Sequence, residues 1–236
     1  MSTGFAGKRG LVWVLVATWV IPAIMLGACI ILMFTSESDN AGKIWEGVAF
    51  LLMLGLWFLF RTLTRHAAMA RAIATGDAPR VLELADRQSA RLRPVYRALA
   101  FSLRCDWPAT LAELDRGGPP PDGKRVLAAT VRIAALVETD RAADARAAFD
   151  RDLARRARSG DVAADALVRL AEARVRWAEG DVPGADALFT RLTEDVRAGE
   201  GVRATAHDYA ARIADQRGDA PAAAKHRARA AALARA

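Results

Sequence analysis

Residues 44–76, IWEGVAFLLMLGLWFLFRTLTRHAAMARAIATG, decide how this chain of 236 residues is organised. The stretch is almost wholly apolar as far as Phe60. It then turns polar and alanine-rich, with nothing to break a helical pattern before Gly76. A helix of this length would extend about 48 Å, which exceeds the roughly 30 Å of a bilayer's hydrocarbon core. The stretch therefore predicts one helix that leaves a membrane and becomes the first helix of a soluble domain.

A second apolar run precedes this stretch. Residues 11–34 are 24 positions without a charged side chain, enough to cross a bilayer with some tilt. We therefore expect a two-helix membrane anchor in residues 1–63, with spans at about 11–34 and 44–63, and a helical domain in residues 64–236. The sequence that ends at Cys29 is similar to a lipoprotein cleavage box. However, the apolar run continues beyond it to Phe34, which disfavours lipidation there.

The charges that flank the two runs predict their orientation. Lys8 and Arg9 precede the first span and several arginines follow the second. The loop of residues 35–43 between the spans holds two acidic residues and one basic residue. The positive-inside rule then places both termini and the 64–236 domain in the cytoplasm. Because arginine and alanine dominate the composition, as in GC-rich bacteria, we expect a multi-pass protein of the bacterial cytoplasmic membrane.

One four-residue pattern recurs through the rest of the chain. Its copies are Gly76-Asp77-Ala78-Pro79, Cys105-Asp106-Trp107-Pro108, Gly180-Asp181-Val182-Pro183 and Gly218-Asp219-Ala220-Pro221, with a degenerate fifth copy at Thr139-Asp140-Arg141-Ala142. Glycine accepts a left-handed conformation past a helix end, aspartate caps the next helix, and proline suits a first helical turn. In the second copy we interpret Cys105 as a substitute for the glycine.

The pattern predicts an all-α fold of five helical hairpins. Their helices are expected at 61–75 with 78–91, 94–104 with 107–116, 123–138 with 141–158, 161–179 with 182–198, and 201–217 with 220–235. The loop of residues 117–123, which is rich in glycine and proline, is interpreted as a stiff connector in preference to a proline-rich ligand.

The hairpins resemble tetratricopeptide repeats. The fourth is the most similar, with Ala173 in its first helix, the turn Gly180-Asp181, and Ala185 and Phe189 in its second helix. This resemblance implies an α-solenoid of about five helix-turn-helix repeats, whose first helices line a concave groove for a peptide or a partner helix. The layout of two spans followed by cytoplasmic repeats also resembles the HemY family of bacterial membrane-anchored repeat proteins.

The resemblance also implies which side chains face such a groove. The groove positions that the repeat alignment gives are His66, Thr130, Arg174, Asp208 and Arg212. Arg174 and Arg212 are the candidates for a carboxylate or an acidic peptide, because arginine can bind a carboxylate through two parallel hydrogen bonds. The alternative is that each is simply a solvent-facing polar group.

The sequence contains none of the common motifs of enzyme active sites that we considered. None of the three histidines has a second histidine or a cysteine at ligand spacing, so we expect no metal site. The glycine-rich nucleotide loops and the nucleophile elbow of hydrolases are also missing from the sequence. We therefore predict no catalytic residues, no cofactor and no enzymatic activity.

The net charge of +7 lies wholly in residues 61–236. A mixed, solvated surface accounts for much of it. The functional interpretation is attraction to anionic lipid through the arginines nearest the anchor, Arg61, Arg65, Arg71, Arg87 and Arg91. The scarcity of aromatic residues in this part argues against nucleic-acid binding. The sequence thus favours a membrane-anchored scaffold for protein–protein interaction. The alternatives are an accessory subunit of a larger membrane complex and a basic surface that binds anionic lipid.

Overall fold

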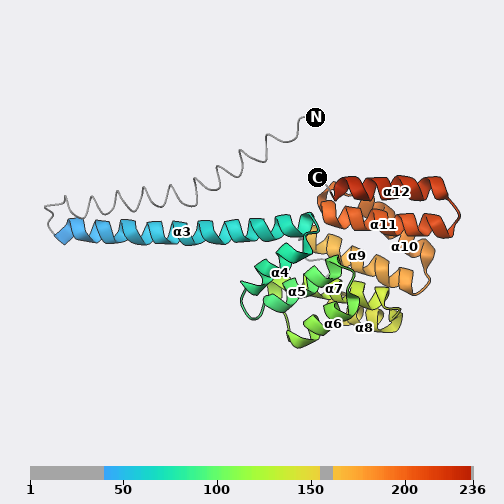
Figure 1. Ribbon diagram of the computed structural model, residues 1–236, viewed down its shortest axis with the longest axis horizontal. Helices are drawn as coiled ribbons and strands as arrows, with labels where there is room; N and C mark the ends of the chain where they lie inside the picture. The colour runs from blue at the N-terminus through green and yellow to red at the C-terminus, as the bar shows by residue number, and fades with distance from the viewer. Residues whose placement is uncertain (1–39, 155–161, 235–236) are drawn as a thin grey trace. The chain divides into compact units, whose positions relative to one another are not determined.

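The computed structural model describes residues 40–154 and 162–234, with side chains from Gly47 onward except that of Val48. Within these residues the protein is wholly helical and contains no strand, which confirms the predicted all-α class. Figure 1 shows the helices in order: α3 (Asn40–Ala74), α4 (Ala78–Asp86), α5 (Arg93–Leu103), α6 (Trp107–Arg116), α7 (Arg125–Glu138), α8 (Ala142–Asp152), α9 (Val162–Ala178), α10 (Val182–Glu194), α11 (Glu200–Gln216) and α12 (Ala220–Leu233), with short 3-10 turns η2 (Asp122–Lys124) and η3 (Val196–Ala198). The predicted helices match these bounds within a few residues. The main difference is that α4 and α8 end earlier.

Helix α3 is unbroken through the change of polarity after Phe60. The chain divides between Ala68 and Met69 into two compact units, a few residues beyond the boundary predicted after Leu63. The predicted first span, 11–34, lies outside the described residues. In the part of the chain that the structure describes, no helix combines enough length and apolarity to cross a membrane.

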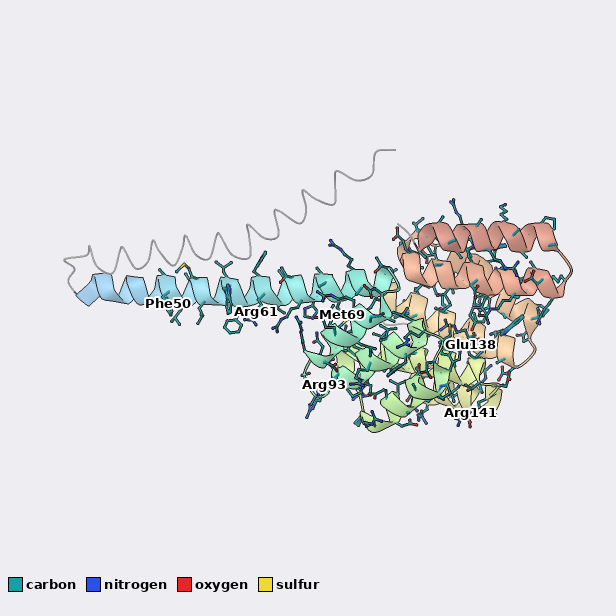
Figure 2. The ribbon with its side chains drawn as sticks, in the orientation of Figure 1. Phe50, Arg61, Met69, Arg93, Glu138 and Arg141 are labelled. Carbon is teal, nitrogen blue, oxygen red and sulfur yellow. The ribbon has the colours of Figure 1, made fainter. Side chains whose placement is uncertain are left out.

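The apolar side chains of α3 are exposed around much of its circumference. Phe50 is labelled in Figure 2, and Leu51, with 66% of its surface exposed, is among the most accessible. Leu52, Leu54 and Leu56 are also exposed. Because successive helical residues are rotated by about 100°, Phe50 and Leu54 lie on one side of the helix, Leu52 and Leu56 on another, and Leu51 between them.

Five joints of one design link the paired helices. At each joint the N–H of the residue that caps the second helix donates to a carbonyl five residues earlier, at 2.9–3.0 Å. At four joints the capping residue is an aspartate whose Oδ1 accepts from a backbone N–H of the next turn. The residue before the cap has positive φ, +82° at Gly180 and +55° at Cys105, so Cys105 does replace the expected glycine.

The joint between α7 and α8 corrects one detail of the sequence analysis. The repeat pattern aligns Asp140 with the capping aspartates, but Asp140 has φ +56° and therefore occupies the glycine position. Arg141 follows it as the helix cap and makes no side-chain capping bond. The degenerate copy is thus shifted by one residue. Aspartate is among the few residues other than glycine that tolerate the left-handed region.

The core is shared between neighbouring helix pairs. One buried cluster joins α7, α8 and α9, and another joins α9, α10 and α11. A third links α5 and α6 to α7. Alanines such as Ala129, Ala171 and Ala206 recur in these clusters, and their small side chains let helices approach closely. Each pair therefore buries its apolar surface partly against the next pair along the chain.

Candidate partner-binding site

Tyr209 on α11 is the centre of a polar and aromatic cluster. Its side chain is buried, with 2% of its surface exposed. The ring stacks on Phe189 of α10 at a centroid distance of 4.8 Å, and it meets Trp177 of α9 edge to face at a centroid distance of 6.4 Å. The hydroxyl donates to Oε1 of Glu138, the last residue of α7, at 2.6 Å. One buried ring thus connects four helices.

Two arginines lie against this ring. The guanidinium carbon of Arg212 is 4.7 Å from the ring centroid, and that of Arg174 is 5.4 Å away. Both distances are within the range of cation–π attraction. Arg174 and Trp177 are three residues apart on α9, and on α11 Arg212 lies three residues after Tyr209 and four after Asp208. Helical periodicity therefore places Arg174 beside Trp177, and Arg212 beside both Tyr209 and Asp208.

The two arginines differ in how their charge is compensated. Arg212 donates from Nη1 to Glu138 at 3.0 Å and from Nε to Asp208 at 3.1 Å. Arg174 makes no ion pair with any residue that the structure describes. Its Nε is buried without a hydrogen-bond acceptor. The cluster therefore contains one compensated guanidinium and one that lacks a carboxylate.

The surroundings of Tyr209 and Arg212 fix their protonation states. Burial raises the pKa of Tyr209 to about 12, and the charge of Glu138 adds to that effect, so the hydroxyl stays protonated at neutral pH. Burial would lower the pKa of Arg212. The carboxylate of Glu138, together with Tyr209 and Asp208, outweighs this effect and raises the pKa above its usual value. Neither group changes its protonation state near neutral pH.

Three of the five predicted groove residues, Arg174, Asp208 and Arg212, come together in this cluster. Thr130 does not belong to an exposed surface, because only 3% of it is accessible and its hydroxyl donates to the Val126 carbonyl at 2.8 Å. His66 lies on α3 in the other compact unit, with Nδ1 2.7 Å from the Thr62 carbonyl.

Sequence reasoning missed Glu138 and Tyr209. Glu138 ends its helix next to a joint and Tyr209 is one of only two tyrosines, but neither fact indicates their contact. They are 71 residues apart, and only the packing of α7 against α9 and of α10 against α11 brings them together.

The five arginines proposed for lipid contact have different environments. Arg61, labelled in Figure 2, lies over the Trp57 ring at 5.1 Å, and Arg65 is exposed on the same helix. Arg71 is exposed, Arg87 pairs with Glu83 at 2.5 Å, and Arg91 borders a cavity described below. The first two belong to the unit that ends at Ala68 and the others to the unit that follows it.

A histidine pair also arises that sequence spacing did not reveal. The α11–α12 hairpin places Nδ1 of His207 3.0 Å from Nδ1 of His226. Burial lowers the pKa of His207, and the positive charges of His226, Arg203 and Arg229 lower it further. Among the described residues no three metal-binding side chains gather, so the pair stands without a third ligand.

Comparison with known proteins gives no relative: no protein-family model matches the chain, and neither a curated protein nor a solved structure is significantly similar to it.

Proposed function

We propose that this protein is a membrane-anchored scaffold whose helical domain binds a partner protein through the cluster around Tyr209. The main support for the proposal is that the guanidinium of Arg174 lacks a carboxylate partner within the described residues. The same guanidinium is placed over an aromatic ring. A carboxylate of a partner would complete this site with two parallel hydrogen bonds.

The composition of the cluster supports a role in protein binding. Tryptophan, tyrosine and arginine are the residues that most often dominate the binding energy of protein interfaces. Here Tyr209 is held by Phe189 and Glu138, and it in turn supports both arginines. A platform that is already ordered before binding loses little conformational entropy when a partner arrives.

The arrangement of helices supports a tetratricopeptide-like solenoid. The cluster draws its polar groups from α7, α9 and α11, each the first helix of a pair, and first helices line the binding surface in that family. The repeated joints and the core clusters shared between neighbouring pairs also fit a stack of repeats.

The proposed anchor rests on the two apolar runs and on the exposed apolar side chains of α3. A helix that is apolar all round is suited to a protein core or to lipid. The side chains between Phe50 and Leu63 that are exposed in this structure fit lipid as their surroundings. Arg61, which follows the apolar run, could extend its guanidinium to the headgroups. We propose that the anchor lies in the bacterial cytoplasmic membrane, with both termini and the helical domain in the cytoplasm.

Affinity purification from native membranes tests the binding site. We expect Arg174→Glu to release most of the proteins that the wild-type chain captures, because it puts a negative charge where a carboxylate should bind. Arg191→Glu is the matched control, since Arg191 is an exposed arginine on the neighbouring helix α10 outside the cluster. An identical set of captured proteins for wild type and both variants would refute the proposed site.

Thiol labelling tests the orientation. Cys105 is exposed on the helical domain, and replacing Cys29 with serine leaves it as the only cysteine of the chain. We expect a membrane-impermeant maleimide to label Cys105 only after the cells are permeabilised. Labelling in intact cells would place the domain outside and overturn the proposed orientation.

The exposed apolar side chains of α3 also favour a second candidate, an accessory subunit packed against the spans of a larger membrane complex. The two candidates differ in the size of the native particle. A free monomer or dimer in mild detergent would support the anchored scaffold, whereas a large stable particle with other chains would support the accessory subunit.

A further inference from the structure

A cavity lies away from Tyr209, where α5, α6 and α7 meet the loop that follows α6. Its volume is about 590 Å³, within the range of sites that hold a small ligand or a few residues of a peptide. Val95, Leu114 and Ala128 contribute apolar surface to it and belong to the buried core of these helices. The floor of the cavity is therefore apolar and part of the packed core.

The loop that forms one wall is held in place. Gly117 lies so close to α5 that an added Cβ would be 2.4 Å from Cβ of Pro94, so only glycine allows this approach. Gly118 has φ +64°, and Pro119 and Pro120 restrict the backbone that follows. The stiff connector predicted from the sequence thus becomes the wall of a preformed site, and little ordering is required when a ligand binds.

The rim of the cavity has an excess of positive charge. The charged residues that line it are Arg91, Arg125, Arg132 and Arg151, against Asp115 and Asp152. Arg132 pairs with Asp115 at 2.6 Å and Arg151 with Asp152 at 2.9 Å. Arg125 pairs with Asp122, which is 83% exposed, and Arg91 has no ion pair within the described residues. Exposed pairs of this kind contribute little and are readily exchanged for a better partner.

We infer that this cavity binds an acidic segment of the partner protein, with a carboxylate at Arg91 and Arg125 and an apolar side chain on the floor. The apolar lining lies inside a recessed cavity, which suits a side chain projecting from a peptide better than a flat lipid surface. The inference rests on the proposed scaffold function and adds a second contact to the one at Tyr209.

The test measures binding of a fluorescein-labelled Glu-Leu-Glu-Leu-Glu peptide to the full chain in non-ionic detergent, by fluorescence anisotropy. We expect the double substitution Arg91→Gln and Arg125→Gln to weaken binding about five- to tenfold. Both side chains are exposed, so the fold should persist, which circular dichroism checks. Arg104→Gln is the matched control: this exposed arginine follows α5 and does not line the cavity. It should leave the affinity unchanged.

Three results would overturn the inference. The first is equal binding of a Gln-Leu-Gln-Leu-Gln peptide, and the second is an affinity that the double substitution does not alter. The third is glycerol phosphate displacing the peptide at lower concentration than glutamate does, which would indicate a headgroup site. The substitution Arg174→Gln separates the two proposals. If Arg174→Gln weakens peptide binding and the cavity variants do not, the site at Tyr209 is supported and the cavity is rejected. If the cavity variants weaken peptide binding and Arg174→Glu releases no partner, the cavity is supported and the site at Tyr209 is rejected.

Discussion

Replacing Tyr209 with phenylalanine should destabilise the helical domain at neutral pH and lose that effect in alkali. The substitution keeps the ring that stacks on Phe189 and removes only the hydroxyl, which donates to Glu138 at 2.6 Å. A hydrogen bond to a charged group contributes about 1.5–3 kcal/mol. Glu138 retains its bond from Arg212, so we expect a value near the low end, about 1.5 kcal/mol. For a domain of this size, that lowers Tm by about 3–6 °C.

The pH dependence follows from the raised pKa of Tyr209. Between the ordinary tyrosine pKa of 10.0 and the folded value of about 12, the unfolded chain releases a proton that the folded chain retains. Stability is therefore lost as the pH rises through this window, by about 1.4 kcal/mol at pH 11. Phenylalanine has no such proton. The difference in the free energy of unfolding between wild type and Tyr209→Phe should thus disappear at about pH 11.

Urea titrations followed by circular dichroism at pH 8 and pH 11 measure both effects. Tyr96→Phe is the matched control, because Tyr96 is also buried in a helix of the domain but its hydroxyl makes no hydrogen bond within the described residues. It should change stability at pH 8 by less than about 0.5 kcal/mol. The reasoning is refuted if Tyr209→Phe and Tyr96→Phe lose the same stability. It is also refuted if the stability difference between wild type and Tyr209→Phe is as large at pH 11 as at pH 8.

Three further predictions concern the joints and the C-terminal hairpin. Asp219→Ala removes the side-chain cap of α12 and should cost about 1 kcal/mol, visible as faster amide hydrogen exchange in that helix; unchanged exchange would contradict it. Cys105→Gly relieves a positive φ and should raise stability by about 1 kcal/mol in urea titrations; no gain would argue against strain there. Because burial lowers the pKa of His207, the unfolded chain binds a proton near pH 6 that the folded chain resists, so stability should fall from pH 7.5 to pH 5.5. The His207→Gln variant should show a shallower fall, and an equally steep fall would exclude His207 as its source.

The sequence predicted the helices well because their boundaries are set locally. Aspartate caps, prolines in the first turn and glycines past the end act within a few residues of each joint, so they can be recognised without knowledge of the packing. The one-residue error at Asp140 arose because an aspartate itself occupies the position with positive φ. An aspartate can either cap a helix or adopt positive φ, and the sequence alone did not distinguish these roles.

The candidate site was predictable only in part. Arg174 and Arg212 were chosen by alignment with a repeat motif, and they do share one aromatic ring. The pairing of Arg212 with Glu138 and the contact of His207 with His226 depend on the side-chain register between helices, which no local pattern encodes. The cavity wall at Gly117 depends in the same way on how closely a loop approaches α5.

The bond between Tyr209 and Glu138 also has a consequence for the order in which the chain matures during synthesis. The joints close through bonds between residues at most five apart, so each hairpin can form soon after it leaves the ribosome. The Tyr209 bond spans 71 residues and waits for α11. A nascent chain that ends after α10 would carry Arg174 without the ring that supports it. The partner surface should therefore become competent only after α11 has been made, which would keep shorter nascent chains from capturing the partner.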